Sequence, residues 1–232
     1  MSGGLPPVLT IDGPGASGKG TLARHVSERL GWYWLDSGLV YRGLAWVCAR
    51  ECGERLEEGA LTPLLPRLHF EAVGRRWHLL SEDRDLTDTL GDEAVANLAS
   101  QISVLASIRA QLLPLQRSCL RSPGLVAEGR DMGTVVFPGA ILKVFLTASP
   151  EIRAERRWRQ LSAAGIHANL YELTEAIHAR DRRDCERETA PLRPAEGALV
   201  LDSTERTVSE LAEQVYVRLK ALSDRSGRDE DT

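Results

Sequence analysis

The stretch VLTIDGPGASGKGT, residues 8–21, decides the fold of this chain. Its opening letters VLTI are aliphatic or β-branched, which predicts a short buried strand ending at Asp12. A glycine-rich segment follows, and a helical pattern begins at Lys19 and continues to Leu30. A strand, a loop of the form G-x-x-x-x-G-K and a helix are the context of a phosphate-binding loop. The sequence therefore predicts such a loop at residues 13–21.

The composition of this loop suits the binding of phosphate oxygens. Backbone N–H groups can converge on a phosphate where side chains are absent, and the N-terminus of the next helix adds a favourable dipole. Lys19 supplies a compact cation, in a chain where only three of the 29 lysine and arginine residues are lysine. Because Gly20 follows it, Thr21 is the nearest hydroxyl that could reach Mg²⁺.

The composition of the whole chain is that of an ordinary globular protein. Its 232 residues suffice for one substantial core with subdomains inserted into it. A formal net charge of −4 argues against a nucleic-acid or membrane surface, which would need a basic excess. The sequence has neither a long apolar run nor a signal-peptide pattern, and its cysteines and histidines show no zinc spacing. We expect a cytoplasmic monomer that acts on small molecules and binds neither nucleic acid nor a membrane.

Strands and helices alternate along the rest of the chain, which predicts a parallel α/β sheet. Residues 67–86 depart from this alternation, because they have the pattern of an antiparallel hairpin followed by a short third strand. We interpret them as an insertion. The strands expected in the parallel sheet lie at residues 8–12, 32–35, 125–127, 141–147 and 199–202.

Two arginine-rich helices are expected near residues 151–164 and 170–188, on either side of a turn at Gly165. Arginines on such helices can be solvated charges in surface salt bridges, and we assign that role to Arg159 and Arg183. For several of the others we expect a lid whose guanidinium groups close on phosphates. Phosphoryl transfer needs such groups because it depends on positioning and on neutralising negative charge.

Several segments beyond the loop resemble those of a known family. They are DSGLVYR at 36–42, ASQ at 99–101, EGRDMGT at 128–134, RDRRDCER at 180–187 and LDST at 201–204. Together they resemble the bacterial cytidylate kinases, of the nucleoside monophosphate kinase family, over nearly the whole chain. The EGRDMGT and R-D-x-x-D-x-x-R segments are far more specific than the loop alone.

This resemblance implies a P-loop NTPase fold. The expected core is a parallel five-stranded sheet flanked by helices, as in adenylate kinase, with a small antiparallel β patch inserted and a helical lid. The implied organisation is core at 1–36, 105–150 and 191–222, an insert that binds the nucleoside monophosphate at 37–104, and a lid at 151–190. The charged segment at 223–232 is expected to be a disordered tail.

The implied activity is direct phosphoryl transfer from ATP, with Mg²⁺, to CMP and dCMP, giving CDP and dCDP. Two alternatives remain open. One is another small kinase of the same core, an adenylate or shikimate kinase, against which the hairpin insert argues. The other is a catalytically inactive nucleotide-binding switch protein, against which an intact Lys19 and the lack of a guanine-reading N-K-x-D segment argue.

The resemblance also implies roles for single residues, assigned by matching position. ATP would be bound by Gly13, Pro14, Gly15, Ala16, Ser17, Gly18, Lys19, Gly20 and Thr21, with Arg156 or Arg157 from the lid. CMP would be bound at its phosphate by Arg42, Arg130 and Arg187 and at its base by Ser100, Arg109 and Asp131. Arg180 and Asp184 would meet its sugar, with Arg180 also near the transferred phosphoryl group, and Ser37 would complete the CMP site. Catalysis would rest on Lys19, Arg130, Arg180 and Arg187, and the metal would lie near Thr21.

The loop departs from the family pattern at one place. The family commonly has G-P-[SA]-G, whereas this chain has GPGA at residues 13–16, so that a glycine has moved by one position. If residue 16 needs a positive φ, Ala16 is strained there. We expect altered loop geometry and not lost function.

Overall fold

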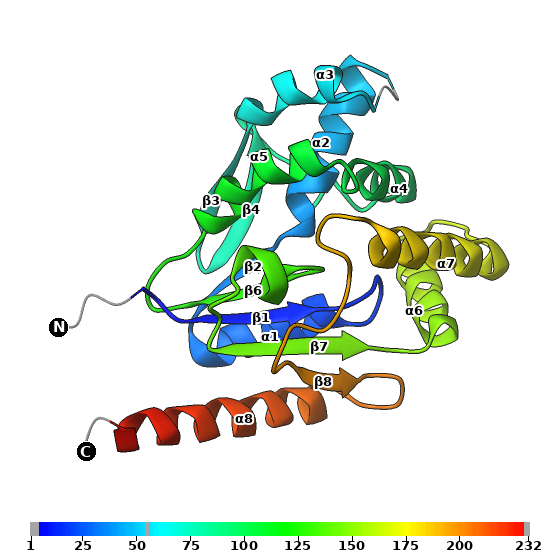
Figure 1. Cartoon of the computed structure of the whole chain (residues 1–232). Coiled ribbons are helices and arrows are strands. Elements are labelled where there is room, and N and C mark those ends of the chain that lie inside the picture. The colour runs from blue at the N-terminus through cyan, green and yellow to red at the C-terminus, as the bar shows by residue number, and fades with distance from the viewer. Residues whose placement is uncertain (1–4, 54–55, 230–232) are drawn as a thin grey trace.

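The computed structural model describes residues 5–53 and 56–229. The centre of the fold is a set of five parallel strands, which are β1 (Val8–Asp12), β2 (Tyr33–Asp36), β6 (Leu125–Gly129), β7 (Leu142–Thr147) and β8 (Leu199–Asp202). They lie side by side in the order β2-β6-β1-β7-β8 (Figure 1). The parallel α/β core that the sequence predicts is confirmed.

The sheet is nevertheless larger than predicted, because the antiparallel patch joins it. Strand β3 (Leu68–Val73) and the short β5 (Arg84–Asp85) both pair antiparallel with β4 (Arg76–Ser81). β4 in turn pairs with β2, where the amide of Trp34 donates to the carbonyl of Arg75 at 2.8 Å. The result is one eight-stranded sheet, so the expectation of five strands is wrong. An open edge strand such as β2 can pair with another strand, and here the hairpin uses that edge.

The first strand, the loop and the first helix follow the predicted pattern. β1 is buried along its whole length, as a central strand covered on both faces must be. Helix α1 (Lys19–Leu30) lies between Gly18 (φ 88°) and Gly31 (φ 63°), which take left-handed conformations that glycine adopts without strain. Gly13 is required for space, since a Cβ there would lie 2.2 Å from the carbonyl oxygen of Leu146.

Helices cover the parallel strands on both faces. Side chains of α1 and of α8 (Val208–Asp229) pack on β1, β7 and β8, and η2 (Met132–Val136), a single π-helical turn, packs on the opposite face. Helix α8 continues to Asp229, into the segment 223–232 for which the sequence predicts disorder. Residues 230–232 lie outside the described part of the chain.

A second apolar core lies above the carboxyl end of β2 and is formed by the predicted insert together with residues 106–117, which follow it (Figure 1). Its helices are α2 (Gly38–Glu51), α4 (Glu93–Ile102) and α5 (Ala106–Arg117), and the short α3 (Glu58–Leu61) and η1 (Thr62–Arg67) lead into β3. Within the described residues no single helix has the length and hydrophobicity to span a membrane. Helices α4 and α5 together reach that length and hydrophobicity, but they are bent by 106° relative to each other.

The predicted lid consists of two helices that follow β7. They are α6 (Pro150–Ala163) and α7 (Leu170–Glu186), which pack against each other beyond the carboxyl ends of the parallel strands (Figure 1). Ser149 caps α6, as predicted, because its hydroxyl accepts from the amide of Ile152. The lid helices and the insert therefore lie at the same end of the sheet as the phosphate loop.

Candidate active site

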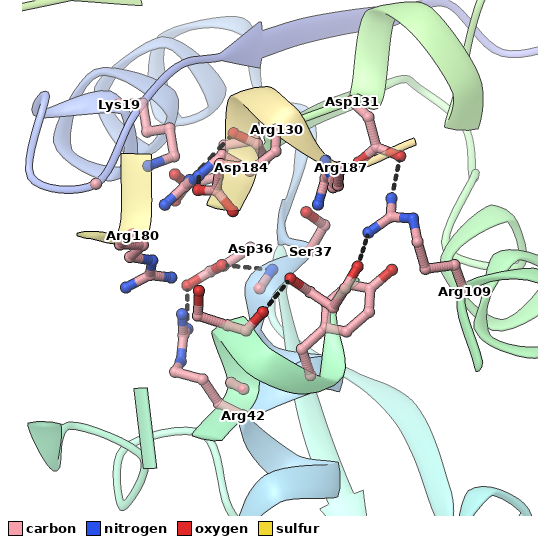
Figure 2. A pocket seen from close by; sticks show the side chains of 18 of the residues that line it. Lys19, Asp36, Ser37, Arg42, Arg109, Arg130, Asp131, Arg180, Asp184 and Arg187 are labelled. Carbon is pink, nitrogen blue, oxygen red and sulfur yellow. Dashed lines mark hydrogen bonds and ion pairs between the residues drawn. The ribbon is translucent and has the colours of Figure 1, made fainter. Parts of the chain in front are cut away.

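The carboxyl ends of β1, β2 and β6 meet at a pocket of about 190 Å³, walled on its other sides by α2, α4, α5 and α7 (Figure 2). This edge of a parallel sheet is where ligands bind in α/β proteins. Of the predicted site residues, the pocket brings together Gly15, Ala16, Lys19, Ser37, Arg42, Ser100, Arg109, Arg130, Asp131, Arg180, Asp184 and Arg187. Those outside its lining are Gly13, Pro14, Ser17, Gly18, Gly20, Thr21, Arg156 and Arg157.

The pocket is basic although the protein is acidic. Six basic side chains line it: Lys19, Arg42, Arg109, Arg130, Arg180 and Arg187. Four acidic side chains accompany them: Asp36, Glu128, Asp131 and Asp184. The lining thus carries a formal excess of positive charge within a chain of formal net charge −4. Concentrating positive charge in a cleft attracts anions to that cleft.

Lys19 lies at the inner end of the phosphate loop. Its Nζ donates a hydrogen bond to the carbonyl of Pro14 at 3.1 Å, so the side chain folds back over the loop. Burial, and then the positive charge of Arg130, lower the pKa of Lys19 to about 7. An anion bound beside Lys19 would favour its charged form, because an opposite charge offsets the cost of burial.

Two carboxylates beside Lys19 line the pocket although the sequence reasoning assigned them no role. Asp36 ends β2 and pairs with Arg42, Nη2 to Oδ2 at 2.6 Å, while its other oxygen accepts from the amide of Gly38. Burial, and then the charge of Asp36, raise the pKa of Glu128 to about 7. Their signal was present, since both stand at the ends of strands inside the motifs DSG and EGRD.

Arg130, Arg180 and Arg187 surround Asp184 of α7 (Figure 2). Arg130 Nε donates to Asp184 at 2.8 Å, which fixes its guanidinium over the pocket. Within the described part of the chain, Arg180 Nε and Arg187 Nη2 are buried and have no hydrogen-bond partner. Buried donors normally find an acceptor, so these two nitrogens mark where an anionic ligand fits.

The three residues predicted to face a base lie together on the opposite side of the pocket. Arg109 and Asp131 form a buried ion pair, and Arg109 also donates to the carbonyl of Ser103 at 3.0 Å. Ser100 lines the pocket beside them and is only 3% exposed. The guanidinium of Arg109 also lies 5.5 Å from the ring centre of Tyr41. These contacts hold a donor and an acceptor in fixed positions.

Asp12 is a further residue whose importance the motif alone did not reveal. Its two carboxylate oxygens accept from the amides of Met132 and Gly133, each at 2.8 Å. Burial raises the pKa of Asp12 to about 6, although these two backbone hydrogen bonds oppose the rise. The carboxylate therefore ties the end of β1 to the EGRDMGT segment, which carries Arg130 and Asp131.

The lid arginines separate according to which element they meet. Arg156 donates to the carbonyl of Ser17 at 3.4 Å and to Ser203 Oγ at 2.9 Å, which places it against the phosphate loop. Arg157 instead pairs with Glu93 of α4 at 2.7 Å, and both residues line a second pocket that also reaches Gly15 and Ala16 of the loop. Arg153, for which no role was predicted, is buried and donates to the carbonyl of Gly15 at 3.2 Å.

Of the two arginines interpreted as solvated charges, the structure confirms one. Arg159 pairs with Glu155 one helical turn away and is exposed. The interpretation of Arg183 is wrong, because it reaches from α7 to α4 and donates to Ser100 and Asn97. The sequence could not show this contact, since it depends on how two distant helices pack.

The described residues contain no group of three or more His, Cys, Asp or Glu side chains that could hold a metal ion. Mg²⁺ does not need such a group, because it usually binds one or two carboxylates together with substrate phosphates and water. Asp36 and Glu128 offer such a pair beside Lys19. Thr21, predicted to lie near the metal, is exposed and outside the pocket lining.

Comparison with known proteins gives a consistent result. A family model described as cytidylate kinase matches residues 9–221. The cytidylate kinase of Methylococcus capsulatus is 49% identical over 206 residues, which cover 88% of this chain and 93% of that protein. The cytidylate kinase of Nitrosococcus oceani is 46% identical over 213 residues, which cover 90% and 94%.

A solved structure shares the fold at much lower identity. A gluconokinase from Sinorhizobium meliloti superposes with a TM-score of 0.51 at 14% identity, over 97% of this chain and 98% of that one. At this level of identity the likeness concerns the fold alone.

Proposed function

The chain belongs to the cytidylate kinase family, and we propose that it transfers the γ-phosphoryl group of ATP directly to CMP and dCMP, giving CDP and dCDP. The observation that carries the proposal is a single pocket that joins the phosphate loop to both a cluster of arginines and a buried Arg109–Asp131 pair. A phosphate would occupy the first group and a base the second.

The chemistry asks little of the protein beyond position and charge. The acceptor is already an anionic phosphate oxygen, so no covalent intermediate and no strong base are required. Two polyanions must come together, and Lys19, Arg42, Arg130, Arg180 and Arg187 reduce their repulsion. Arg180 Nε and Arg187 Nη2, which have no hydrogen-bond partner among the described residues, would gain phosphate acceptors on binding.

Selection of cytosine follows from hydrogen-bond polarity. Cytosine presents an amino donor at C4 next to an acceptor at N3, whereas uracil presents an acceptor next to a donor. The carboxylate of Asp131 can accept from the amino group, and Arg109 can donate to N3 or to the 2-carbonyl. Uracil would set its 4-carbonyl against the Asp131 carboxylate, so that two acceptors would meet in a buried site.

The donor nucleotide and the metal belong to the proposal as well. ATP would lie along residues 13–21, with Arg153 and Arg156 holding the loop from the lid. Asp36 and Glu128 would hold Mg²⁺, and a bound cation would favour the charged form of Glu128, whose pKa is raised by burial and then by the charge of Asp36. When bound, Mg²⁺ supplies neutralisation of charge on the phosphates.

We further propose that residues 151–190 close over the bound nucleotides as a lid. Arg153 and Arg156 link this segment to the phosphate loop, while Arg157 links it to Glu93 of the insert. A closed lid would exclude water that could otherwise hydrolyse ATP. We also propose that the protein acts as a cytoplasmic monomer on small molecules alone.

The test is steady-state turnover with CMP, dCMP, UMP, AMP and shikimate, measured side by side by coupled release of ADP. We expect turnover of CMP and dCMP, with kcat/KM for CMP at least about tenfold above that for UMP, since about 1.4 kcal/mol corresponds to one decade. A preference for AMP or shikimate would replace the proposal by one of the kinase alternatives. Nucleotide binding without any turnover would favour the inactive switch protein.

A further inference from the structure

The side chain of Arg183 connects the lid to the wall of the base pocket. Arg183 lies on α7, and its Nε donates to Ser100 Oγ of α4 at 3.1 Å. Its Nη2 donates to Asn97 Oδ1 at 3.0 Å, one turn away on the same helix. The Arg183 guanidinium thus contacts two residues of α4, of which Ser100 lines the pocket and Asn97 does not.

This contact restricts how the Ser100 hydroxyl can be used. A hydroxyl has one proton to donate and two lone pairs to accept with, whereas a guanidinium can only donate. Ser100 Oγ must therefore accept from Arg183, and its own proton must point elsewhere. Among the hydrogen bonds of the described residues, none is donated by Ser100 Oγ. Ser100 is 3% exposed and lines the pocket, so the direction left for its proton is into the pocket.

We propose that Arg183 is a positioning residue that makes Ser100 a hydrogen-bond donor toward the base. The inference rests on the proposed function, because it names how the same pocket distinguishes bases. A donor at this wall suits the N3 acceptor of cytosine and opposes the N3–H of uracil. The positive charge of Arg183 also strengthens Ser100 as a donor, since hydrogen bonds that involve a charged group are the stronger ones.

Without Arg183 the hydroxyl would be free to rotate and to accept as well as donate. Ser100 could then meet the N3–H of uracil with a lone pair, and part of the discrimination would be lost. The expected change is therefore in the ratio of two substrates, not in overall activity. A purely structural role of Arg183 in packing α7 on α4 would affect CMP and UMP alike.

The experiment measures kcat/KM for CMP and UMP, together with the Kd of each nucleotide in the absence of ATP. We expect Arg183→Met to reduce the CMP/UMP preference by about five- to tenfold, the lower part of the range for mispairing one buried polar group. Arg183→Lys, which keeps a charged N–H donor, should retain more of the preference. Asn97→Ala is the matched control, because it removes the other partner of Arg183 and should leave the ratio unchanged.

A double-mutant comparison makes the test specific to Ser100. In a Ser100→Ala background, Arg183→Met should cause no further change in the ratio, because the hydroxyl that it orients is gone. The inference would be overturned if Arg183→Met left the CMP/UMP ratio of kcat/KM unchanged, or if Asn97→Ala lowered that ratio as much as Arg183→Met does. It would also be overturned if Arg183→Met changed the ratio equally with and without Ser100. Failure of the proposed function would look different, since the wild type would then fail to phosphorylate CMP at all.

Discussion

The carboxylate of Glu128 lies directly over Gly20, with Oε1 only 2.8 Å from the position that a Cβ on Gly20 would occupy. Glu128 comes from β6 and Gly20 from the first turn of α1, so the contact joins the phosphate loop to the neighbouring strand. It gives a physical reason for glycine after Lys19, where many phosphate loops have a hydroxyl residue. The space that a side chain would need belongs to the carboxylate.

Gly20→Ala is therefore expected to destabilise the ligand-free protein. The added methyl group must displace a buried carboxylate, and overpacking of this kind costs about 1–3 kcal/mol. Chemical denaturation followed by circular dichroism measures the effect. In a Glu128→Ala background the same substitution should cost much less, since the obstructing atoms are absent. An equal loss of stability in both backgrounds would show that the Glu128 side chain does not restrict which residue fits at position 20.

Ala16→Gly is expected to stabilise the protein. Ala16 has φ 57°, so the condition for strain set out from the sequence is met. A left-handed residue with a Cβ costs about 1–2 kcal/mol, and a glycine loses about 0.4–1 kcal/mol more entropy on folding, which leaves a net gain of about 0.5–1 kcal/mol. Gly15→Ala serves as the control, because Gly15 lacks a positive φ and its Cβ would meet only ordinary contacts. Chemical denaturation measures the change, and a denaturation midpoint of Ala16→Gly below that of the wild type would contradict the strain argument.

Lys19→Met should leave the fold intact and slow phosphoryl transfer by at least about 10²-fold, the scale for losing one well-placed electrostatic donor. Single-turnover kinetics with saturating ATP and CMP isolate the chemical step. Lys220→Met is the matched control, because Lys220 lies on α8 away from the pocket and should keep full turnover. Turnover of Lys19→Met within a few-fold of wild type would remove Lys19 from the mechanism.

Asp131→Ala should lower activity on CMP more than on UMP and so reduce the preference for CMP over UMP in kcat/KM. The carboxylate has the polarity to accept from the cytosine amino group, and mispairing one buried polar group costs about 1–3 kcal/mol. Asp131 also pairs with Arg109, which allows a second interpretation, in which it only orients that arginine. Under that interpretation both substrates would weaken alike, and an unchanged CMP/UMP ratio would exclude base reading by Asp131.

Titration of Glu128 should be visible in the pH dependence of stability. Its pKa rises from 4.5 unfolded to about 7 folded, so between these values the native state holds a proton that the unfolded state has released. The contribution of Glu128 to stability therefore falls as pH rises from about 4.5 to about 7. The lowered pKa of Lys19 acts in the opposite sense above pH 7.

Denaturation midpoints of wild type and Glu128→Gln across this pH range measure the contribution, because the amide does not titrate. We expect the wild type to lose stability relative to Glu128→Gln as pH rises. This pH dependence should weaken when Mg²⁺ and a nucleotide are bound, since a cation held by Asp36 and Glu128 favours their charged forms. Parallel curves in the free protein would show that folding leaves the pKa of Glu128 unchanged. A slope that Mg²⁺ leaves unchanged would argue against metal binding at this pair.

Much of the fold and part of the site could be predicted from the sequence, because their signals are local. The spacing of glycines after a β-branched strand predicts the phosphate loop from neighbouring residues alone. Arg180, Asp184 and Arg187 are spaced at i, i+4 and i+7, so any helix through them places all three on one face. These residues do line one pocket, together with the motif residues at the ends of β2 and β6.

Contacts between segments far apart in the chain were decided by the tertiary structure alone. Arg156 and Arg157 are neighbours in the sequence but point about 100° apart on a helix, and only the docking of α6 sends one to the phosphate loop and the other to Glu93. The same holds for Arg183 on Ser100, for Glu128 over Gly20 and for the hairpin that extends the sheet. Sequence patterns specify which face a residue occupies within its own element, whereas the partner of that face depends on how separate elements pack.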